Sequence, residues 1–141
     1  MFESGLTGLD RFAEHAELDE NILNGLNVWA TPFTGLSVIL NRETITHQDA
    51  KGYRESFDLL LTIGEYTGGQ LHLPGLGFSL IYDPGTVVAL ASNVLQHGVC
   101  PVAGEWACLA HFWHQKVGER LRLMQSRWLT MDDLTCNIIQ M

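Results

Sequence analysis

Between about residues 27 and 114 the chain is a succession of short apolar runs, and this pattern limits the possible folds more than any other feature. The runs that are typical of strands are 36–41, 44–48, 57–64, 70–73, 78–82, 87–91, 94–99 and 107–113. Glycine and proline separate them, for example at Gly68-Gly69, Pro74-Gly75 and Pro84-Gly85. Many short strands at this spacing predict a β-sandwich or a barrel. We therefore expect a mainly β fold with flanking helices.

Two histidines and one aspartate form a candidate metal site. His47 and Asp49 are separated by one residue, and His97 follows much later in the chain. On a strand, residues i and i+2 point to the same face, so His47 and Asp49 can both reach one cation. Two imidazoles and a carboxylate that leave positions open are a ligand set of non-haem Fe(II). A set divided between an early and a late strand favours a jelly roll (a double-stranded β-helix) of about eight short strands. The alternative is that both histidines are structural.

The segments outside the strand region are predicted to be helical. Residues 7–24 have apolar residues near helical spacing among acidic ones, and Gly25 is a plausible end of this helix. Residues 116–128 carry half of the Lys and Arg residues, and Thr130 is a candidate N-cap of a short final helix. We expect one domain over residues 1–141, made of an N-terminal helix (1–26), a jelly-roll core (27–114) and a C-terminal helical segment (115–141).

The acidic balance of the sequence narrows the kinds of partner. Asp and Glu number 16 against 8 Lys and Arg, which gives a formal net charge of −8. Such a chain gains no general attraction to phosphate, so any contact with nucleic acid must be local. The three cysteines include no C-x-x-C pair, and they therefore indicate neither a disulfide framework nor a zinc site. Because the sequence has neither a signal-peptide pattern nor an apolar stretch of membrane-helix length, we expect an intracellular monomer, nuclear or cytoplasmic, without membrane contact.

Several blocks of the sequence match those of a known family in the same order. They include Thr46-His47-Gln48-Asp49, Tyr66-Thr67-Gly68-Gly69, Leu73-Pro74-Gly75-Leu76-Gly77, Tyr82-Asp83-Pro84-Gly85-Thr86 and Leu95-Gln96-His97-Gly98-Val99. Through these blocks, residues 35–121 resemble the TET/JBP-like nucleobase dioxygenases, especially their compact fungal branch. The resemblance implies a jelly roll that uses Fe(II), 2-oxoglutarate and O2 to oxidise a methyl group on a pyrimidine in DNA, either 5-methylcytosine or thymine. It also implies that His47, Asp49 and His97 bind the iron.

The sequence departs from this family at the residue expected to hold the cosubstrate. A buried carboxylate is costly without a partner, and a bidentate arginine is the usual one. The family's arginine falls at Trp106 here, and no Arg or Lys lies between His97 and Lys116. Three alternatives remain open: His72 donates to the carboxylate, Arg42 turns inward, or Trp106 and Cys108 line a pocket for a less charged cosubstrate.

Cations and aromatic residues beside the triad are candidates for contacts with the substrate. Lys51 and Arg54 follow Asp49 and are placed to meet a phosphate, although a solvated turn is the simpler interpretation. Tyr66 is available for stacking on a base, although most such aromatic residues belong to a core. The sequence thus predicts a 2-oxoglutarate-dependent dioxygenase acting on a DNA base. The alternatives are a catalytically impaired relative that binds or regulates a partner, and a dioxygenase acting on a small molecule.

Overall fold

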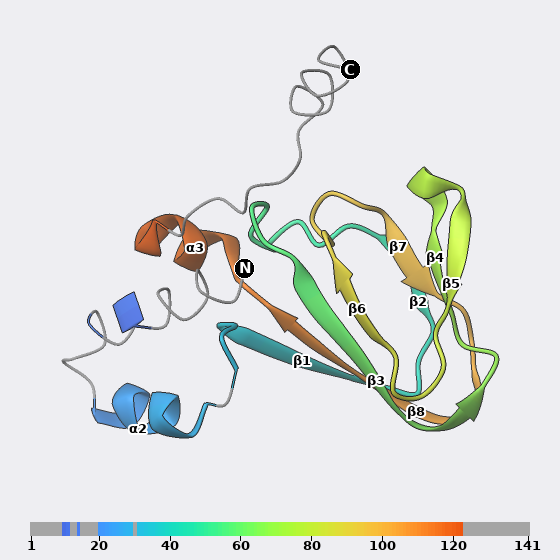
Figure 1. Ribbon diagram of the computed structural model, residues 1–141, viewed down its shortest axis with the longest axis horizontal. Coiled ribbons are helices and arrows are strands. Elements are labelled where there is room, and N and C mark those ends of the chain that lie inside the picture. Colours follow the sequence, from blue (N-terminus) through green and yellow to red (C-terminus); the bar gives the residue numbers. More distant parts are fainter. Residues whose placement is uncertain (1–9, 12–13, 15–19, 30, 123–141) are drawn as a thin grey trace, which may run out of the picture.

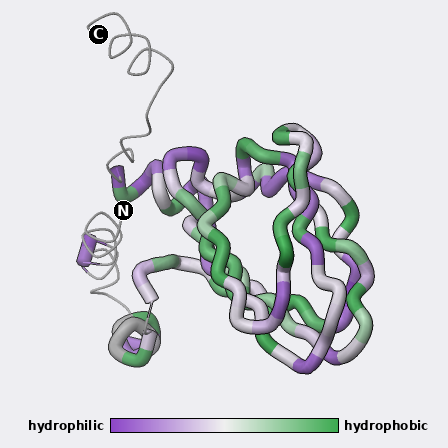
Figure 2. The backbone as a smooth tube through the Cα atoms, turned by 45° about the vertical axis from the view of Figure 1, so that its right-hand side comes forward, coloured by the Kyte–Doolittle hydropathy of each residue, from purple (hydrophilic) through white to green (hydrophobic). Residues whose placement is uncertain are grey.

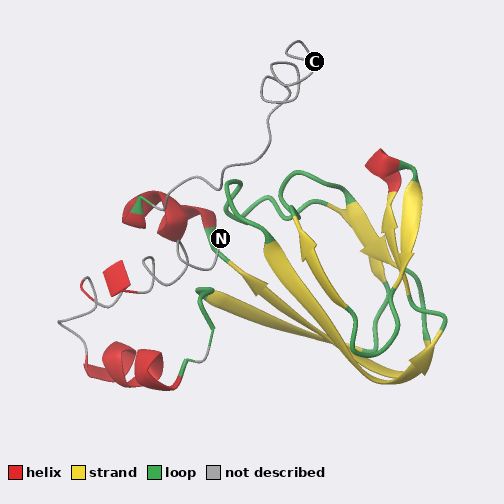
Figure 3. Cartoon of the chain, in the orientation of Figure 1, coloured by secondary structure: helices red, strands yellow, loops and turns green. Residues whose placement is uncertain are grey.

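The computed structural model describes residues 10–11, 14, 20–29 and 31–122 (Figure 1). The strands in this part of the chain are β1 (Gly35–Leu40), β2 (Thr44–His47), β3 (Asp58–Thr67), β4 (Gln70–Leu73), β5 (Phe78–Ile81), β6 (Val87–Leu90), β7 (His97–Val99) and β8 (Ala103–Phe112). A short 3-10 helix, η1 (Pro74–Leu76), joins β4 to β5. Helices α2 (Glu20–Val28) and α3 (Gln115–Leu121) lie beside the strands, at one side of the molecule (Figure 3).

The strands form two antiparallel four-stranded sheets. The first, which we call the major sheet, has the order β1-β8-β3-β6, and the second, the minor sheet, has the order β2-β7-β4-β5. Successive strands change sheet at every connection except β4 to β5, which form a hairpin. The two sheets face each other (Figure 1). This alternation is the arrangement of a jelly roll, so the predicted fold class is confirmed.

The pleat of β8 turns alternate side chains toward the space between the sheets. Trp106 and Cys108 are buried there, and Ala110 and Phe112 share their face of the strand. β1 runs antiparallel beside β8, with Ile39 opposite Cys108. Hydrophobic residues recur along the strands of both sheets (Figure 2), and those that point inward form the main core cluster. The core therefore lies between the sheets and surrounds the pocket described below.

β3 and β8 are longer than the sequence pattern predicted. The expected strands stopped at Gly64 and started at residue 107, because glycine usually weakens a strand. In the structure the two strands remain paired beyond these positions, with Gly64 opposite Trp106 and Gly104 opposite Tyr66. Both glycines have a positive φ, 128° and 120°, and a Cβ at either position would meet the opposing backbone. They therefore permit close pairing inside the long ribbon rather than ending it.

The strand that carries the second histidine, His97, is shorter than predicted. Residues 94–96 were expected to belong to it, but β7 begins at His97. A turn precedes it, in which the N–H groups of Val94 and Leu95 both donate to the carbonyl of Ala91. We call residues 91–95 the clamp turn, because it contacts the loop that carries Asp49.

The helices differ from the prediction at their ends. α2 continues through Gly25 to Val28, because a glycine inside a helix costs only about 1 kcal/mol and does not by itself end it. α3 begins after His114, whose Nδ1 accepts a hydrogen bond from the Lys116 N–H, and it ends at Arg122 with a left-handed backbone. The predicted continuation to residue 128 and the helix after Thr130 lie outside the described residues. Within the described residues, no helix combines the length and apolar character needed to span a membrane.

Candidate metal centre and its pocket

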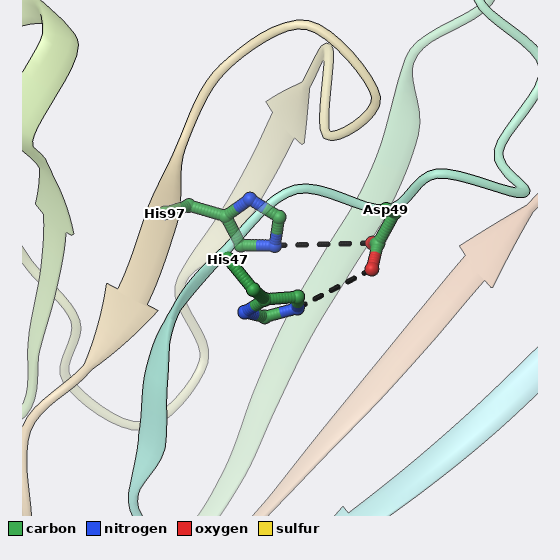
Figure 4. Close-up of side chains that lie close together, drawn as sticks. All are labelled: His47, Asp49 and His97. Carbon is green, nitrogen blue, oxygen red and sulfur yellow. Dashed lines mark ion pairs between the residues drawn. The ribbon is translucent and has the colours of Figure 1, made fainter.

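The three predicted ligands converge on one point. His47 ends β2, and it is paired with His97 at the start of β7, so their ring centroids are 4.4 Å apart. Asp49 follows in the next loop and turns its carboxylate toward both rings (Figure 4). Nε2 of His47 is 3.3 Å from Asp49 Oδ1, and Nε2 of His97 is 3.8 Å from Asp49 Oδ2. One donor atom from each residue lies within 4.8 Å of the others, which a single cation can bridge.

Each imidazole is held in the orientation that a metal ligand needs. Nδ1 of His47 donates to the carbonyl of Ile45 at 2.8 Å, and Nδ1 of His97 donates to the carbonyl of Leu95 at 3.0 Å. A carbonyl only accepts, so the proton of each neutral ring is on Nδ1 and the lone pair is on Nε2. Metal-binding histidines are usually fixed by such a second hydrogen bond. The donor set and its open side therefore fit a non-haem Fe(II) ion with positions left for small ligands.

The clamp turn fixes the backbone of Asp49. The Asp49 N–H donates to the carbonyl of Ser92 at 3.0 Å, and Nδ2 of Asn93 donates to the Asp49 carbonyl at 2.8 Å. The neighbouring Gln48 side chain donates to the Val94 carbonyl at 2.7 Å. Because the Asp49 side chain is about half exposed, these backbone bonds are what hold its carboxylate between the two imidazoles.

Asp58 is a buried carboxyl that the sequence did not single out. It begins β3, is 4% exposed, lines the pocket and accepts a hydrogen bond from the Ser92 hydroxyl, whereas its Oδ1 has no partner. Burial raises the pKa of Asp58 to about 6; Ser92 opposes the shift and the charge of Asp49 adds to it. The signal available in the sequence was an acidic residue, directly after Phe57, at the start of an apolar run. Through Ser92, Asp58 is connected to the backbone of Asp49.

A pocket of about 560 Å³ lies beside the triad, and all three candidate ligands line it. Its volume is in the range of small-molecule sites. We call the part beside His47, Asp49 and His97 the metal end. The part lined by Trp106, Cys108 and Tyr82 is the tryptophan end. The pocket thus follows the inner face of β8 between the two sheets.

The tryptophan end is buried and uncharged. Trp106, Cys108 and Tyr82 are at most 5% exposed, and the Tyr82 hydroxyl lies 3.5 Å from Cys108 Sγ. Burial raises the pKa of the Cys108 thiol, and burial and the contact with Cys108 raise the pKa of Tyr82. Both groups therefore stay protonated at neutral pH. The pocket has room for 2-oxoglutarate, but these three buried side chains offer no charge to its distal carboxylate.

Two of the predicted cations reach the pocket and one does not. Arg42 and Lys51 are exposed and belong to the pocket lining. Arg54 is exposed and does not line it; its backbone N–H donates to the Gln115 side chain. The position of Arg54 therefore agrees with the interpretation of a solvated turn. Lys51, by contrast, lies two residues beyond Asp49 and beside the metal end. His114, which the sequence did not suggest, lines the pocket near the same end.

The position of His72 corrects the expectation that it binds the cosubstrate. Leu71 on the same strand points into the pocket, so strand alternation directs His72 to the outer face of the minor sheet. There its Nδ1 is hydrogen-bonded to Ser79, and its Nε2 lies 2.9 Å from Cys100 Sγ. Its side chain is therefore separated from the pocket by the sheet itself.

Tyr66 also differs from the expectation, because it is a core residue. It is 6% exposed, its hydroxyl donates to the Tyr82 carbonyl at 2.6 Å, and its ring packs against Trp106 with centroids 6.1 Å apart. It is not among the residues that line the pocket. With its hydroxyl and its ring both engaged, Tyr66 supports the tryptophan end from behind rather than meeting a substrate.

Comparisons with known proteins agree with this architecture. A solved structure described as NgTET1 in complex with 5mC DNA superposes with a TM-score of 0.58 over 89% of this chain, at 15% sequence identity. The chain covers 47% of that protein, and at this identity the similarity speaks for the fold alone. No curated protein sequence matches the chain significantly. Residues 10–115 match the model of the Tet_JBP family, the oxygenase domain of the 2OGFeDO superfamily, and the chain therefore belongs to that family.

Proposed function

We propose that this protein is an Fe(II)- and 2-oxoglutarate-dependent dioxygenase that hydroxylates the methyl group of a modified pyrimidine in DNA. The observation that carries the proposal is the convergence of His47, Asp49 and His97 beside a pocket of suitable volume. Membership of an oxygenase family supports the same chemistry. The choice of DNA rests on the neighbour whose description names 5mC DNA.

The residues of the metal end have separate roles in this proposal. Nε2 of His47, Nε2 of His97 and the Asp49 carboxylate would hold the iron, and the hydrogen bonds from Nδ1 keep both rings aimed at it. Bound Fe(II) with a 2-oxo acid would supply oxidative decarboxylation coupled to hydroxylation of a C–H bond. Leu60 and Val99 line the pocket together with Trp106 and keep water from much of its wall.

A DNA substrate is compatible with the charge of this chain only through local contacts. The net charge of −8 opposes general binding to phosphate. Lys51 lines the pocket beside the metal end and is the cation placed to meet a backbone phosphate there. A base in a duplex must leave the stack to reach a metal between two sheets, at a cost of a few kcal/mol. We therefore expect single-stranded DNA to react faster than duplex DNA.

The experiment compares three substrates under identical conditions. Fe(II)-loaded protein with 2-oxoglutarate and O2 is given an oligonucleotide containing 5-methylcytosine, its thymine counterpart, or the free methylated nucleosides. The proposal expects succinate and a hydroxymethylated base in at least one oligonucleotide reaction, with Asp49→Ala protein as the blank. Oxidation of free nucleosides alone would instead indicate a small-molecule dioxygenase.

A catalytically impaired relative is the second candidate, because the tryptophan end lacks a buried charge. It predicts that the protein binds iron but that succinate never exceeds the Asp49→Ala level with any substrate. Anaerobic Fe(II) binding, measured by competition with a chelator, separates this outcome from failure of the site itself. Absence of Fe(II) binding would refute both candidates.

A further inference from the structure

The distal carboxylate of 2-oxoglutarate needs a partner in this pocket. When the keto acid group of the cosubstrate faces the metal, its second carboxylate is left inside the protein, where an unpaired charge is unfavourable. We propose that Arg42, from the turn between β1 and β2, binds this carboxylate. The inference rests on the proposed function. It places the cation that binds the distal carboxylate on this exposed turn, because β8 offers no cation to the pocket.

The inner face of β8 cannot supply the anchor. Its inward residues are Trp106, Cys108, Ala110 and Phe112, and all of them are uncharged. On the adjacent strands, the lining residues Ser37 and Ile39 of β1 and Leu60 of β3 are uncharged. The remaining lining residue of β3, Asp58, is an acid, so neither strand supplies a cation. Apart from the histidines, the cations that line the pocket within the described residues are Arg42 and Lys51.

Arg42 is fixed beside the tryptophan end by its neighbour. The Asn41 N–H donates to the Trp106 carbonyl at 3.0 Å, and the Trp106 N–H donates to Asn41 Oδ1 at 2.6 Å. Asn41 has a φ of 46°, a left-handed conformation that asparagine tolerates and that turns the chain from β1 toward β2. The next residue, Arg42, therefore lies next to Trp106, at the point where the chain turns toward β2, and it lines the pocket.

Lys51 lies at the other end of the same pocket. Its carbonyl accepts from the N–H of Gln115 at the start of α3, and the adjacent Gly52 pairs with His114. The seven residues of β8 from Trp106 to Phe112 are six steps of the strand and span roughly 20 Å at its usual rise. Lys51 is thus beside the candidate ligand Asp49, whereas Arg42 is five residues before His47, at most roughly 17 Å away along an extended chain. An extended Arg42 side chain and the cosubstrate, placed end to end, cover the separation between Arg42 and His47.

The Arg42 guanidinium is available for a ligand. Among the described residues, no hydrogen bond or ion pair engages it. By contrast, Arg11 donates to the carbonyls of Leu121 and Arg122 at 2.8 and 2.9 Å. An unpaired arginine at the wall of a pocket, in a chain with net charge −8, fits a carboxylate as its partner because two parallel N–H groups can bind it.

The test measures cosubstrate binding without turnover. Fe(II)-loaded protein is titrated anaerobically with 2-oxoglutarate, and with an analogue in which an isopropyl group replaces the distal carboxylate, so that only the 2-oxo acid end is charged. The charge-transfer absorbance of the iron chelate reports binding. Arg42→Ala should weaken 2-oxoglutarate binding by roughly tenfold to a hundredfold, and should leave the analogue within about twofold. Arg54→Ala removes an exposed arginine that does not line the pocket, and as the charge-matched control it should change neither. Lys51→Ala removes the other cation of the lining and should have a smaller effect than Arg42→Ala.

A relocation variant sharpens the result. In Arg42→Ala/Trp106→Arg protein, the guanidinium moves from the turn to β8, and 2-oxoglutarate affinity should recover without a gain for the analogue. If thermal unfolding shows that this variant does not fold, the comparison of Arg42→Ala with Lys51→Ala decides alone.

Several results would overturn the inference. They are an equal effect of Arg42→Ala on both ligands, no effect on either, a larger effect of Lys51→Ala, or wild-type preference for the analogue. The last result would mean that the uncharged tryptophan end selects an apolar 2-oxo acid. Wild-type protein that binds iron but no 2-oxoglutarate would also refute it. Arg42-dependent binding without oxidation of any oligonucleotide would instead refute only the proposed substrate.

Discussion

The two ends of the pocket differ in how completely they are built. At the metal end, hydrogen bonds hold the three candidate ligands: both imidazoles donate to carbonyls, and the clamp turn holds the backbone of Asp49. At the tryptophan end, packing dominates, because Tyr66 supports Trp106 and Tyr82 contacts Cys108. Under the proposed function, metal binding and cosubstrate binding therefore depend on separate parts of the pocket and can vary independently. Substitutions at the metal end should change metal affinity, and those at the tryptophan end should change stability.

The largest effect is expected from removing the carboxylate of the candidate ligand Asp49. Asp49→Ala should lower Fe(II) affinity by more than about 100-fold, since even outer hydrogen-bond partners of metal ligands are worth 10- to 100-fold. Succinate production should fall to background. Chelator competition measures the affinity, with Asp83→Ala, an exposed aspartate that does not line the pocket, as the matched control. Equal Fe(II) affinity in the two variants would contradict the assignment of the metal end.

The second effect concerns the pH dependence of stability and comes from Asp58. Burial raises the pKa of this carboxyl from its ordinary value of 3.8 to about 6. The folded protein then binds the proton more tightly than the unfolded chain, so the free energy of unfolding should fall as pH rises from 3.8 to about 6. The loss amounts to about 3 kcal/mol at most.

Asp58→Asn should remove this component, because the amide does not titrate. Urea unfolding of metal-free protein at a series of pH values measures the slope, and Asp83→Asn is the control. If wild type and Asp58→Asn showed the same slope between pH 4 and 6, Asp58 would not be a desolvated acid.

A smaller effect is expected from the clamp turn. Ser92→Ala removes the hydroxyl that donates to Asp58, and thereby loosens the turn whose carbonyl accepts from the Asp49 N–H. Fe(II) affinity should fall by about tenfold, as for other indirect partners of metal ligands. Ser79→Ala removes a comparable serine bonded to His72 on the outer face and should leave the affinity unchanged. A loss in the control as large as in Ser92→Ala would exclude a specific role for the clamp turn.

The smallest effect tests the tryptophan end. Tyr66→Phe removes the hydrogen bond to the Tyr82 carbonyl and should lower the free energy of unfolding by about 1 kcal/mol. Fe(II) affinity and oligonucleotide binding should not change, since Tyr66 does not line the pocket. Denaturant unfolding and fluorescence anisotropy measure the two quantities. Weaker oligonucleotide binding at unchanged stability would restore Tyr66 as a substrate contact.

The positions of most strands, and the pair His47 and Asp49, could be predicted because strands are periodic and the pair is local. Short apolar runs between turn residues indicated the strands. The short spacing kept His47 and Asp49 close together, although Asp49 lies in the loop after β2 rather than on a strand. The boundaries at Gly64 and Gly104 could not be predicted, because a glycine that ends a strand and one that permits close pairing look alike in sequence. Likewise, His72 was a plausible ligand until the position of Leu71 fixed the face it occupies.

The fold class and the candidate ligand set were accessible from the sequence, since they depend on residue identity and short-range spacing. The resemblance to the TET/JBP-like family added that Trp106 stands where an arginine is expected. It took the folded chain to bring His97 to His47, to connect Asp58 with the clamp turn through Ser92, and to hold Arg42 beside Trp106 through Asn41. These relations join residues far apart in the chain. They depend on strand register and on the packing of the two sheets, which no local pattern encodes.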